Sequence, residues 1–311
     1  MRRFIIDTDT GSDDVWAIIE ALRCPAVRVE AITTVCGNLP LELCGINAIH
    51  ACDAAGTYHP PVYRGMGRPL LREEAFYAKN VHGEDGLSDM HLPTPERGFE
   101  KLCAMDAITE LCLDNPGEIE IVTCGPLTNI AMAMLRCPEL AASIGKMWIL
   151  GGSGGDVGNM TPAAEYNIYC DPESAYIVLH SGVNATWVTW DAFRDGGELS
   201  FAEAEELGRR GKAAEFCVRC TEKLREYYRR KYSRDSFGVV DSVVMTAALF
   251  PEICSERYAA ECDIDLAPGA NRGHFTADPA GKPNTEVCSR VDTKLYKEKL
   301  FSLLGDSQRK N

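Results

Sequence analysis

Four aspartates stand within eight residues near the start of the chain, at positions 7, 9, 13 and 14. The apolar run Phe4–Ile6 precedes them directly, and an amphipathic stretch with apolar residues at positions 15, 16, 18, 19 and 22 follows. Carboxylates this close repel one another unless a cation or the hydroxyl groups of a substrate lie among them. We therefore expect a cation or a ligand to bind at residues 7–14.

The residues on either side of the cluster predict a strand, a tight turn and a helix. Phe4–Ile6 has the composition of a short buried strand, and Gly11 permits a turn. Ser12 or Asp13 can cap the helix that begins after the turn. The acids then lie at the carboxyl end of a strand, beside a helix N-terminus. In open α/β sheets, ligands bind at this position.

Strand-like and helical patterns alternate along the rest of the chain. Strands are expected at residues 31–35, 118–122, 146–150 and 185–189, with closing strands at 264–266 and 285–291. Residues 62–92 are expected to form loops around short elements. This rhythm predicts an α/β fold with a Rossmann-like, mostly parallel central sheet covered by helices. Because no internal repeat or linker interrupts it, residues 1–311 are expected to form a single domain. Helices are expected at 41–55, 106–113, 130–135, 172–180, 201–230, 239–250 and 294–304.

The composition excludes several classes of function. The 311 residues include 32 Lys and Arg against 46 Asp and Glu, a net charge of −14. A nucleic-acid interface would require a basic patch, so this acidity instead favours a cation site and a small neutral substrate. No apolar run approaches the length that spans a membrane, and no signal peptide is evident, so we expect a cytoplasmic protein.

The 14 cysteines are expected to be reduced thiols. Cys217 and Cys220 form the only C-x-x-C pair. A structural zinc site usually needs a second such pair or a nearby His. We therefore interpret the pair as two thiols on adjacent turns of a helix.

Other motif classes fit the sequence less well. Phosphatases of the haloacid-dehalogenase type also carry D-x-D after an apolar run, but they have Thr or Val where this chain has Gly11. No phosphate-binding P-loop sequence occurs. The glycines at positions 151–155 lack the spacing of a dinucleotide-binding turn. We expect them to form a loop that lets residues 159–167 approach a ligand.

Residues 7–14 resemble the D-T-D-x-G-x-D-D fingerprint of the inosine/uridine-preferring nucleoside hydrolases. Further segments across nearly the whole chain are similar to motifs of the same family. They are the G-N turn at 36–38, the H-G-x-x-G-L loop at 82–87, G-P-L-T-N at 125–129, G-N-x-T-P-x-A-E-F-N at 158–167 and the Lys-Pro-Asn segment at 282–284.

The resemblance implies a Ca²⁺-dependent N-glycosidase that hydrolyses a ribonucleoside to ribose and a free base. It implies that Asp9, as the catalytic residue, takes a proton from the attacking water. It also implies a homodimer or homotetramer that acts in nucleoside salvage, with no nucleic-acid or membrane partner. The Ca²⁺ ligands carried over are Asp9, Asp14, Asp241 and the backbone carbonyl of Cys124. The substrate contacts expected are Asp13, Asn38, His82, Asn159, Glu165, Tyr166, Asn167, Tyr227, Tyr228, Val240 and Asp241.

Val240 departs from the family pattern. Many members carry His before the last metal-binding acid, where it protonates the departing base, and a purine-specific group carries Trp, which stacks on the base. Val can do neither, so three interpretations stay open. In the first, another residue activates the base; in the second, the substrate is a 7-deazapurine nucleoside such as queuosine; in the third, the protein binds nucleosides with little catalysis. Residues that could replace His in the first case are His82, Trp190, Arg194, Tyr227, Tyr228 and Tyr232.

Overall fold

The structure is a computed structural model that describes residues 1–153, 157–194 and 197–306. Within these residues, nine strands form one sheet in the order β10-β9-β11-β6-β5-β4-β1-β2-β3. A separate antiparallel ribbon pairs β7 with β8. The strands are β1 Arg2–Thr8, β2 Val27–Thr34, β3 Val62–Arg64, β4 Ile119–Thr123, β5 Lys146–Leu150, β6 Ala185–Val188, β7 Glu198–Ser200, β8 Ser236–Gly238, β9 Cys254–Ile264, β10 Phe275–Asp278 and β11 Thr285–Val291.

Every strand pairing from β3 across the sheet to β11 is parallel, and β9 and β10 extend the edge in antiparallel orientation. The chain builds outward from β1 in one direction to β2 and β3, and in the other direction to β4, β5 and β6. The switch point therefore lies between the carboxyl ends of β1 and β4, where α/β sheets bind their ligands. This arrangement confirms the predicted α/β fold with its mostly parallel sheet.

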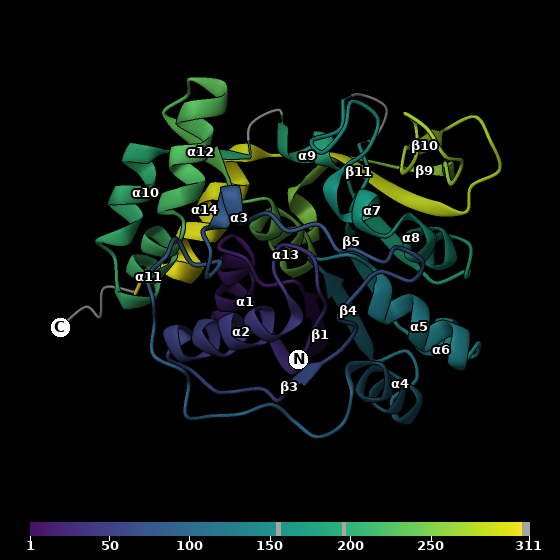
Figure 1. The fold of residues 1–311 in the computed structure, drawn as a ribbon, viewed down its shortest axis with the longest axis horizontal. Helices are drawn as coiled ribbons and strands as arrows, with labels where there is room; N and C mark the ends of the chain where they lie inside the picture. The colour runs from purple at the N-terminus through teal and green to yellow at the C-terminus, as the bar shows by residue number, and fades with distance from the viewer. Residues whose placement is uncertain (154–156, 195–196, 307–311) are drawn as a thin grey trace.

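Two apolar cores cover the two faces of the sheet. Side chains alternate along β1, so Phe4 and Ile6 join one core and Ile5 joins the other. The first core takes side chains from α1, α2, α13 and α14, and the second from α4, α5, α6 and α8 (Figure 1). Those helices are α1 Asp14–Arg23, α2 Leu41–Ala55, α13 Val240–Leu249, α14 Thr293–Leu304, α4 Ala104–Asp114, α5 Thr128–Arg136, α6 Leu140–Ser143 and α8 Pro172–Leu179.

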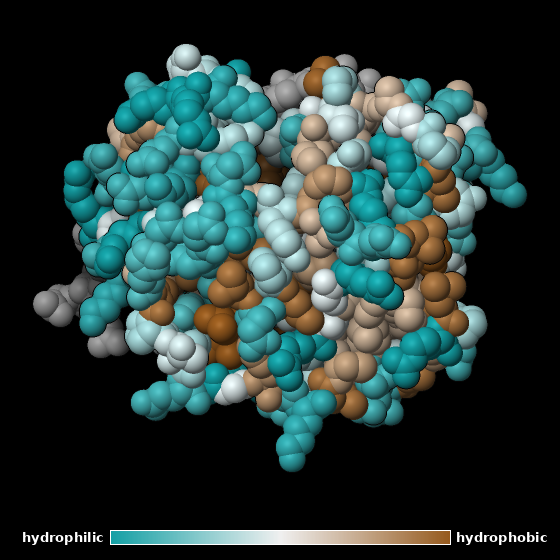
Figure 2. Space-filling model, viewed as in Figure 1, coloured by the Kyte–Doolittle hydropathy of each residue, from teal (hydrophilic) through white to brown (hydrophobic). Residues whose placement is uncertain are grey.

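A further group of helices adds side chains to the first core and lies close to the carboxyl ends of the strands. In Figure 1, α10 Phe201–Gly208, α11 Lys212–Cys220 and α12 Glu222–Tyr232 stand together, with α3 Lys79–His82 beside α12. Hydrophilic side chains cover this part of the surface (Figure 2). The remaining short helices are α7 Tyr166–Cys170, α9 Trp190–Arg194 and the 3₁₀ turn η1 Pro251–Ile253.

Several local expectations were wrong. The strand expected at residues 264–266 is instead the end of β9, whose exposed, charged residues hide its strand character from an apolar pattern. The expectation for residues 62–92 is confirmed, because they form loops around two short elements, β3 and α3. Neither Ser12 nor Asp13 caps α1 through its side chain. The carboxylate of Asp14 instead accepts the Gly11 amide at 2.8 Å, so the acid holds the turn from inside the helix.

All fourteen cysteines are free thiols, as expected. Cys220 donates through Sγ to the carbonyl of Cys217 on α11, at 3.1 Å. Among the described helices, none combines the length and the apolar character that crossing a bilayer requires.

Candidate functional site

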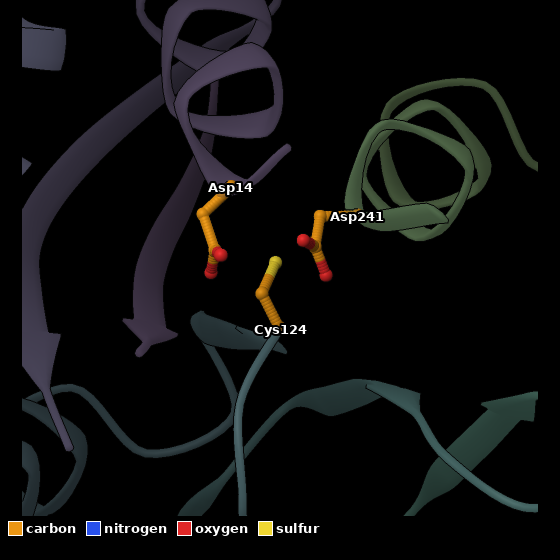
Figure 3. Close-up of side chains that lie close together, drawn as sticks. All are labelled: Asp14, Cys124 and Asp241. Carbon is orange, nitrogen blue, oxygen red and sulfur yellow. The ribbon is translucent and has the colours of Figure 1, made fainter. Parts of the chain in front are cut away.

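Two carboxylates and one thiol converge at the switch point from three different elements. Asp14 begins α1, Asp241 lies in the first turn of α13, and Cys124 follows β4. One ligand atom from each side chain lies within 4.8 Å of the other two. Figure 3 shows the three side chains pointing toward one another. Asp9 follows β1 in the same region: the charge of Asp14 acts on Asp9, and the charge of Asp9 acts on Asp241.

The carboxylate of Asp9 has one fixed and one free oxygen. Its Oδ2 accepts the backbone amide of Asn38 at 2.6 Å. Its Oδ1 is buried and has no hydrogen-bond partner within the described part of the chain. Oδ1 of Asp13 is in the same condition. Buried polar atoms without a partner are uncommon, because each costs about 1–3 kcal/mol. The two free oxygens therefore indicate that a cation or water belongs among the acids.

Burial is the largest cause of the raised pKa of each of these acids. Burial raises the pKa of Asp13 to about 6, and burial together with the charge of Asp13 raises that of Asp14 to about 7. Burial and neighbouring carboxylates also raise the pKa values of Asp9 and Asp241 well above the ordinary range. A divalent cation among these groups would favour their charged forms.

Cys124 lies beside these acids. Its carbonyl oxygen accepts a hydrogen bond from Nδ2 of Asn167 at 2.8 Å. Glu165 caps α7: its carboxylate accepts the backbone amides of Asn167, Ile168 and Gly152 at 2.8, 3.1 and 3.3 Å. Burial nevertheless raises the pKa of Glu165 to about 7. The Glu165–Asn167 segment is thereby fixed by its own hydrogen bonds before any ligand enters.

His82 is buried at the end of α3 and is not the surface histidine that its loop sequence allowed. The backbone N–H of Ser12 donates to its Nδ1 at 3.3 Å, and the Ser12 hydroxyl lies 2.8 Å from the same atom. Because Nδ1 accepts a backbone amide, the proton of the neutral ring is on Nε2. Burial lowers the pKa of His82 to about 4. His82 is thus a neutral donor at neutral pH.

A cavity of about 320 Å³ rises from the acids toward α12. Its volume falls in the range of small-molecule sites. Leu224, Tyr228 and Tyr232 line it at four-residue intervals along α12, and their exposed fractions rise from 3% through 7% to 41%. This gradient identifies the C-terminal end of α12 as the mouth of the cavity. Asp13 and Asp241, which are buried and line the cavity, form part of its floor.

The cavity brings together most of the residues that the sequence singled out. Trp190 also lines it, whereas the side chain of Arg194 lies outside the described residues, as do residues 154–156 of the glycine-rich loop. The hydroxyl of Tyr166 points to the carbonyls of Gly37 and Phe76, at 3.1 and 3.2 Å. The predicted residues among its lining are Asp13, Asn38, His82, Cys124, Asn159, Glu165, Tyr166, Asn167, Tyr227, Tyr228, Tyr232, Val240 and Asp241.

Two contributors were missed by the sequence interpretation. Ser12 was considered only as a helix cap, but it orients His82. Lys231 lines the cavity at its mouth and donates to the hydroxyl of Tyr227 at 2.6 Å. Four-residue spacing from Tyr227 to Lys231 on a helix could have indicated that contact.

Gly37 is required for the position of Asp9. A Cβ atom at Gly37 would lie 2.1 Å from Oδ2 of Asp9. We expect Gly37→Ala to displace the carboxylate and to lower kcat by about 100-fold. Gly67→Ala is the matched control, because its Cβ would meet its nearest neighbour at 3.8 Å. Equal kcat values for the two variants would contradict the requirement.

Comparisons with known proteins match almost the whole chain to one family. The profile of the inosine-uridine preferring nucleoside hydrolase family matches residues 4–298. A probable uridine nucleosidase 1 of Oryza sativa subsp. japonica is 35% identical over 255 residues, which are 80% of this chain and 77% of that protein.

Two solved structures share the fold over almost their whole length. The plant nucleoside hydrolase PpNRh1 superposes with a TM-score of 0.92 at 31% identity, covering 98% of this chain and 99% of that one. A purine-preferring ribonucleoside hydrolase from Gardnerella vaginalis superposes with a TM-score of 0.91 at 26% identity, covering 97% and 98%. The name of the Oryza protein records uridine and that of the Gardnerella protein records purines, so the family alone does not determine the base.

Proposed function

Because this chain belongs to the inosine-uridine preferring nucleoside hydrolase family and is an N-glycosidase, we propose that it hydrolyses ribonucleosides to ribose and free base in a Ca²⁺-dependent reaction. The observation that carries the proposal is the convergence of buried acids at the sheet's switch point, with two carboxylate oxygens left free. Nucleoside hydrolysis follows from the family, whereas the metal and the residue roles are inferred from the site.

The residues present suit a hard divalent cation. Asp9, Asp14 and Asp241 offer carboxylate oxygens, and Cys124 offers its carbonyl. Ca²⁺ prefers a set of oxygen ligands, including carboxylates and backbone carbonyls. A bound cation would supply positive charge that lowers the pKa of a neighbouring water to a range in which a carboxylate can deprotonate it.

Asp9 is the group placed to take that proton. Its Oδ2 is held by the Asn38 amide, which leaves Oδ1 free to accept. The C1′–N bond then breaks with its electron pair moving to the base, while the water oxygen bonds to C1′. Positive charge develops on the ribose as the bond breaks, and the surrounding carboxylates stabilise it.

The ribose hydroxyl groups are proposed to bind at the polar floor. Oδ1 of Asn159 has no partner within the described residues and lies on the cavity wall. A hydroxyl donor would satisfy it, as it would Oδ1 of Asp13. Sugars that lack the matching hydroxyl would leave these atoms unpaired in a closed site and would be rejected.

The test is release of ribose from inosine, adenosine, guanosine, uridine, cytidine and a 7-deazapurine nucleoside. We expect turnover in Ca²⁺ that falls by at least about 100-fold in a calcium chelator and returns when Ca²⁺ is restored. Preference for the 7-deazapurine nucleoside would show that the apolar Val240 selects a base without nitrogen at position 7. Ribose binding without turnover would contradict the hydrolase and favour a nucleoside-binding protein.

A further inference from the structure

The cavity has opposite charge at its two ends. Its floor carries the carboxylates of Asp13 and Asp241, both almost completely buried. Its mouth carries Lys231, the one lysine or arginine among the described residues that line it. His82 supplies no charge near neutral pH, because burial lowers its pKa to about 4. The ammonium group therefore determines the electrostatic character of the outer end.

The hydroxyl and rings of two tyrosines hold Lys231 in place. Its Nζ lies 2.6 Å from the hydroxyl of Tyr227, and 5.1 and 5.2 Å from the ring centroids of Tyr227 and Tyr232. Partial burial would lower the pKa of Lys231, but hydrogen bonds to the two tyrosine hydroxyls outweigh it and raise the pKa. The side chain thus remains a cation at any pH at which the enzyme would be assayed.

No carboxylate shares this ammonium group. Within the residues that the structure describes, no ion pair involves Lys231, whereas Lys223 on the same helix pairs with Asp89 and Glu226, each at 3.8 Å. Of the three N–H bonds of an ammonium group, only some are occupied by the tyrosines. The N–H bonds that the tyrosines leave free can donate to a ligand in the cavity that Lys231 lines. A nucleoside would lie there with its ribose at the acids and its base toward α12.

We propose that Lys231 stabilises the departing base as an anion and selects nucleosides whose base carries an oxo group. This inference rests on the proposed function. As the C1′–N bond breaks, its electron pair enters the ring of the base and is shared with the oxo oxygen. Lys231 donates an N–H to that oxygen without giving up its proton. The base later takes up the proton that Asp9 removed from water, so the products are ribose and neutral base.

The polarity of the cavity matches the charge separation of the reaction. Ribose becomes positive beside the acids, and the base becomes negative beside Lys231. Charges that are already in place at both ends favour the transition state over the neutral substrate. Val240 cannot provide a proton to the base, so this chain would stabilise the leaving group by charge where family members with His protonate it.

The experiment compares Lys231→Met, Lys231→Arg and wild type on inosine, adenosine and p-nitrophenyl riboside. We expect Lys231→Met to lower kcat on inosine by about tenfold, because the group is partly screened by solvent. Adenosine lacks an oxo group, and p-nitrophenolate is a stable anion that needs little help, so kcat on both should stay within about twofold. Lys231→Arg should recover most of the loss on inosine.

Arg230→Met is the matched control, because Arg230 is exposed on the same helix and does not line the cavity. Its kcat values should equal those of wild type. An equal loss for Lys231→Met on all three substrates, or no loss on any, would overturn the role of Lys231.

A binding measurement keeps the inference testable apart from catalysis. Calorimetry should show hypoxanthine binding about fivefold more weakly to Lys231→Met than to wild type, because a neutral oxo base loses one hydrogen bond to a charged donor. Equal affinities would overturn the inference even if wild type hydrolyses nucleosides. Weaker binding combined with no ribose release by wild type would support base recognition by Lys231 and contradict only the hydrolase.

Discussion

Asp9→Asn is expected to lower kcat by about three orders of magnitude or more while the protein stays folded. Asn keeps the shape of the side chain and can still hold an oxygen toward the Asn38 amide, which now bonds Oδ2 of Asp9 at 2.6 Å. It cannot accept a proton from water. Burial and the charge of Asp14 raise the pKa of Asp9 well above the ordinary range, and a bound Ca²⁺ would favour the charged form that can accept the proton. Steady-state kinetics on the best ribonucleoside measure the effect.

Asp14→Asn is the comparison that separates proton transfer from metal binding. Asp14 is proposed only as a Ca²⁺ ligand, and its carboxylate is otherwise occupied by Thr8, Gly11 and Asn38. Its loss should be recovered largely by raising Ca²⁺, whereas the loss in Asp9→Asn should persist at saturating Ca²⁺. If high Ca²⁺ restored Asp9→Asn as well, Asp9 would be a ligand and not the base.

Parts of this site were predictable because they are local in sequence. Phe4–Ile6 is apolar at every position, since β1 is buried on both faces of a parallel sheet. The four acids that follow are adjacent to it, so their place at the strand end follows from the strand itself. Asp241 and Cys124 lie far along the chain, and only the family resemblance connected them to Asp9 before the structure was known.

The features that escaped prediction depend on contacts between distant residues. His82 looked like a loop residue, but it is buried and contacts Ser12, which is 70 residues away. The exposed residues of β9 conceal a strand that pairs with β11. In the sequence, Lys231 cannot be distinguished from other lysines of a charged helix. Only the structure shows that it lies on the face of α12 that lines the cavity. Patterns of apolar residues contain no information on such neighbours.

Without Ca²⁺, the protein is expected to lose stability as pH rises from about 4 to about 8. Burial raises the pKa of Asp13 to about 6 and that of Asp14 to about 7, from values near 4 in an unfolded chain. In that range the folded state therefore binds more protons than the unfolded state, and the free energy of unfolding falls with rising pH. In chelator, the melting temperature should be lower at pH 8 than at pH 5.5 by about 5 °C or more.

Ca²⁺ should reverse this trend, because it replaces the protons that the acids otherwise retain. Binding to the folded state alone raises stability by mass action, and deprotonated acids bind more tightly, so the increase in melting temperature should be larger at pH 8 than at pH 5.5.

Glu20→Gln is the control. Burial raises the pKa of Glu20 to about 8, but this residue packs against Thr246 in the core, away from the metal position. The variant should therefore flatten part of the pH dependence and leave the Ca²⁺ effect intact, while Asp14→Asn should reduce both. A Ca²⁺ effect of equal size at the two pH values would mean that these acids do not bind the ion.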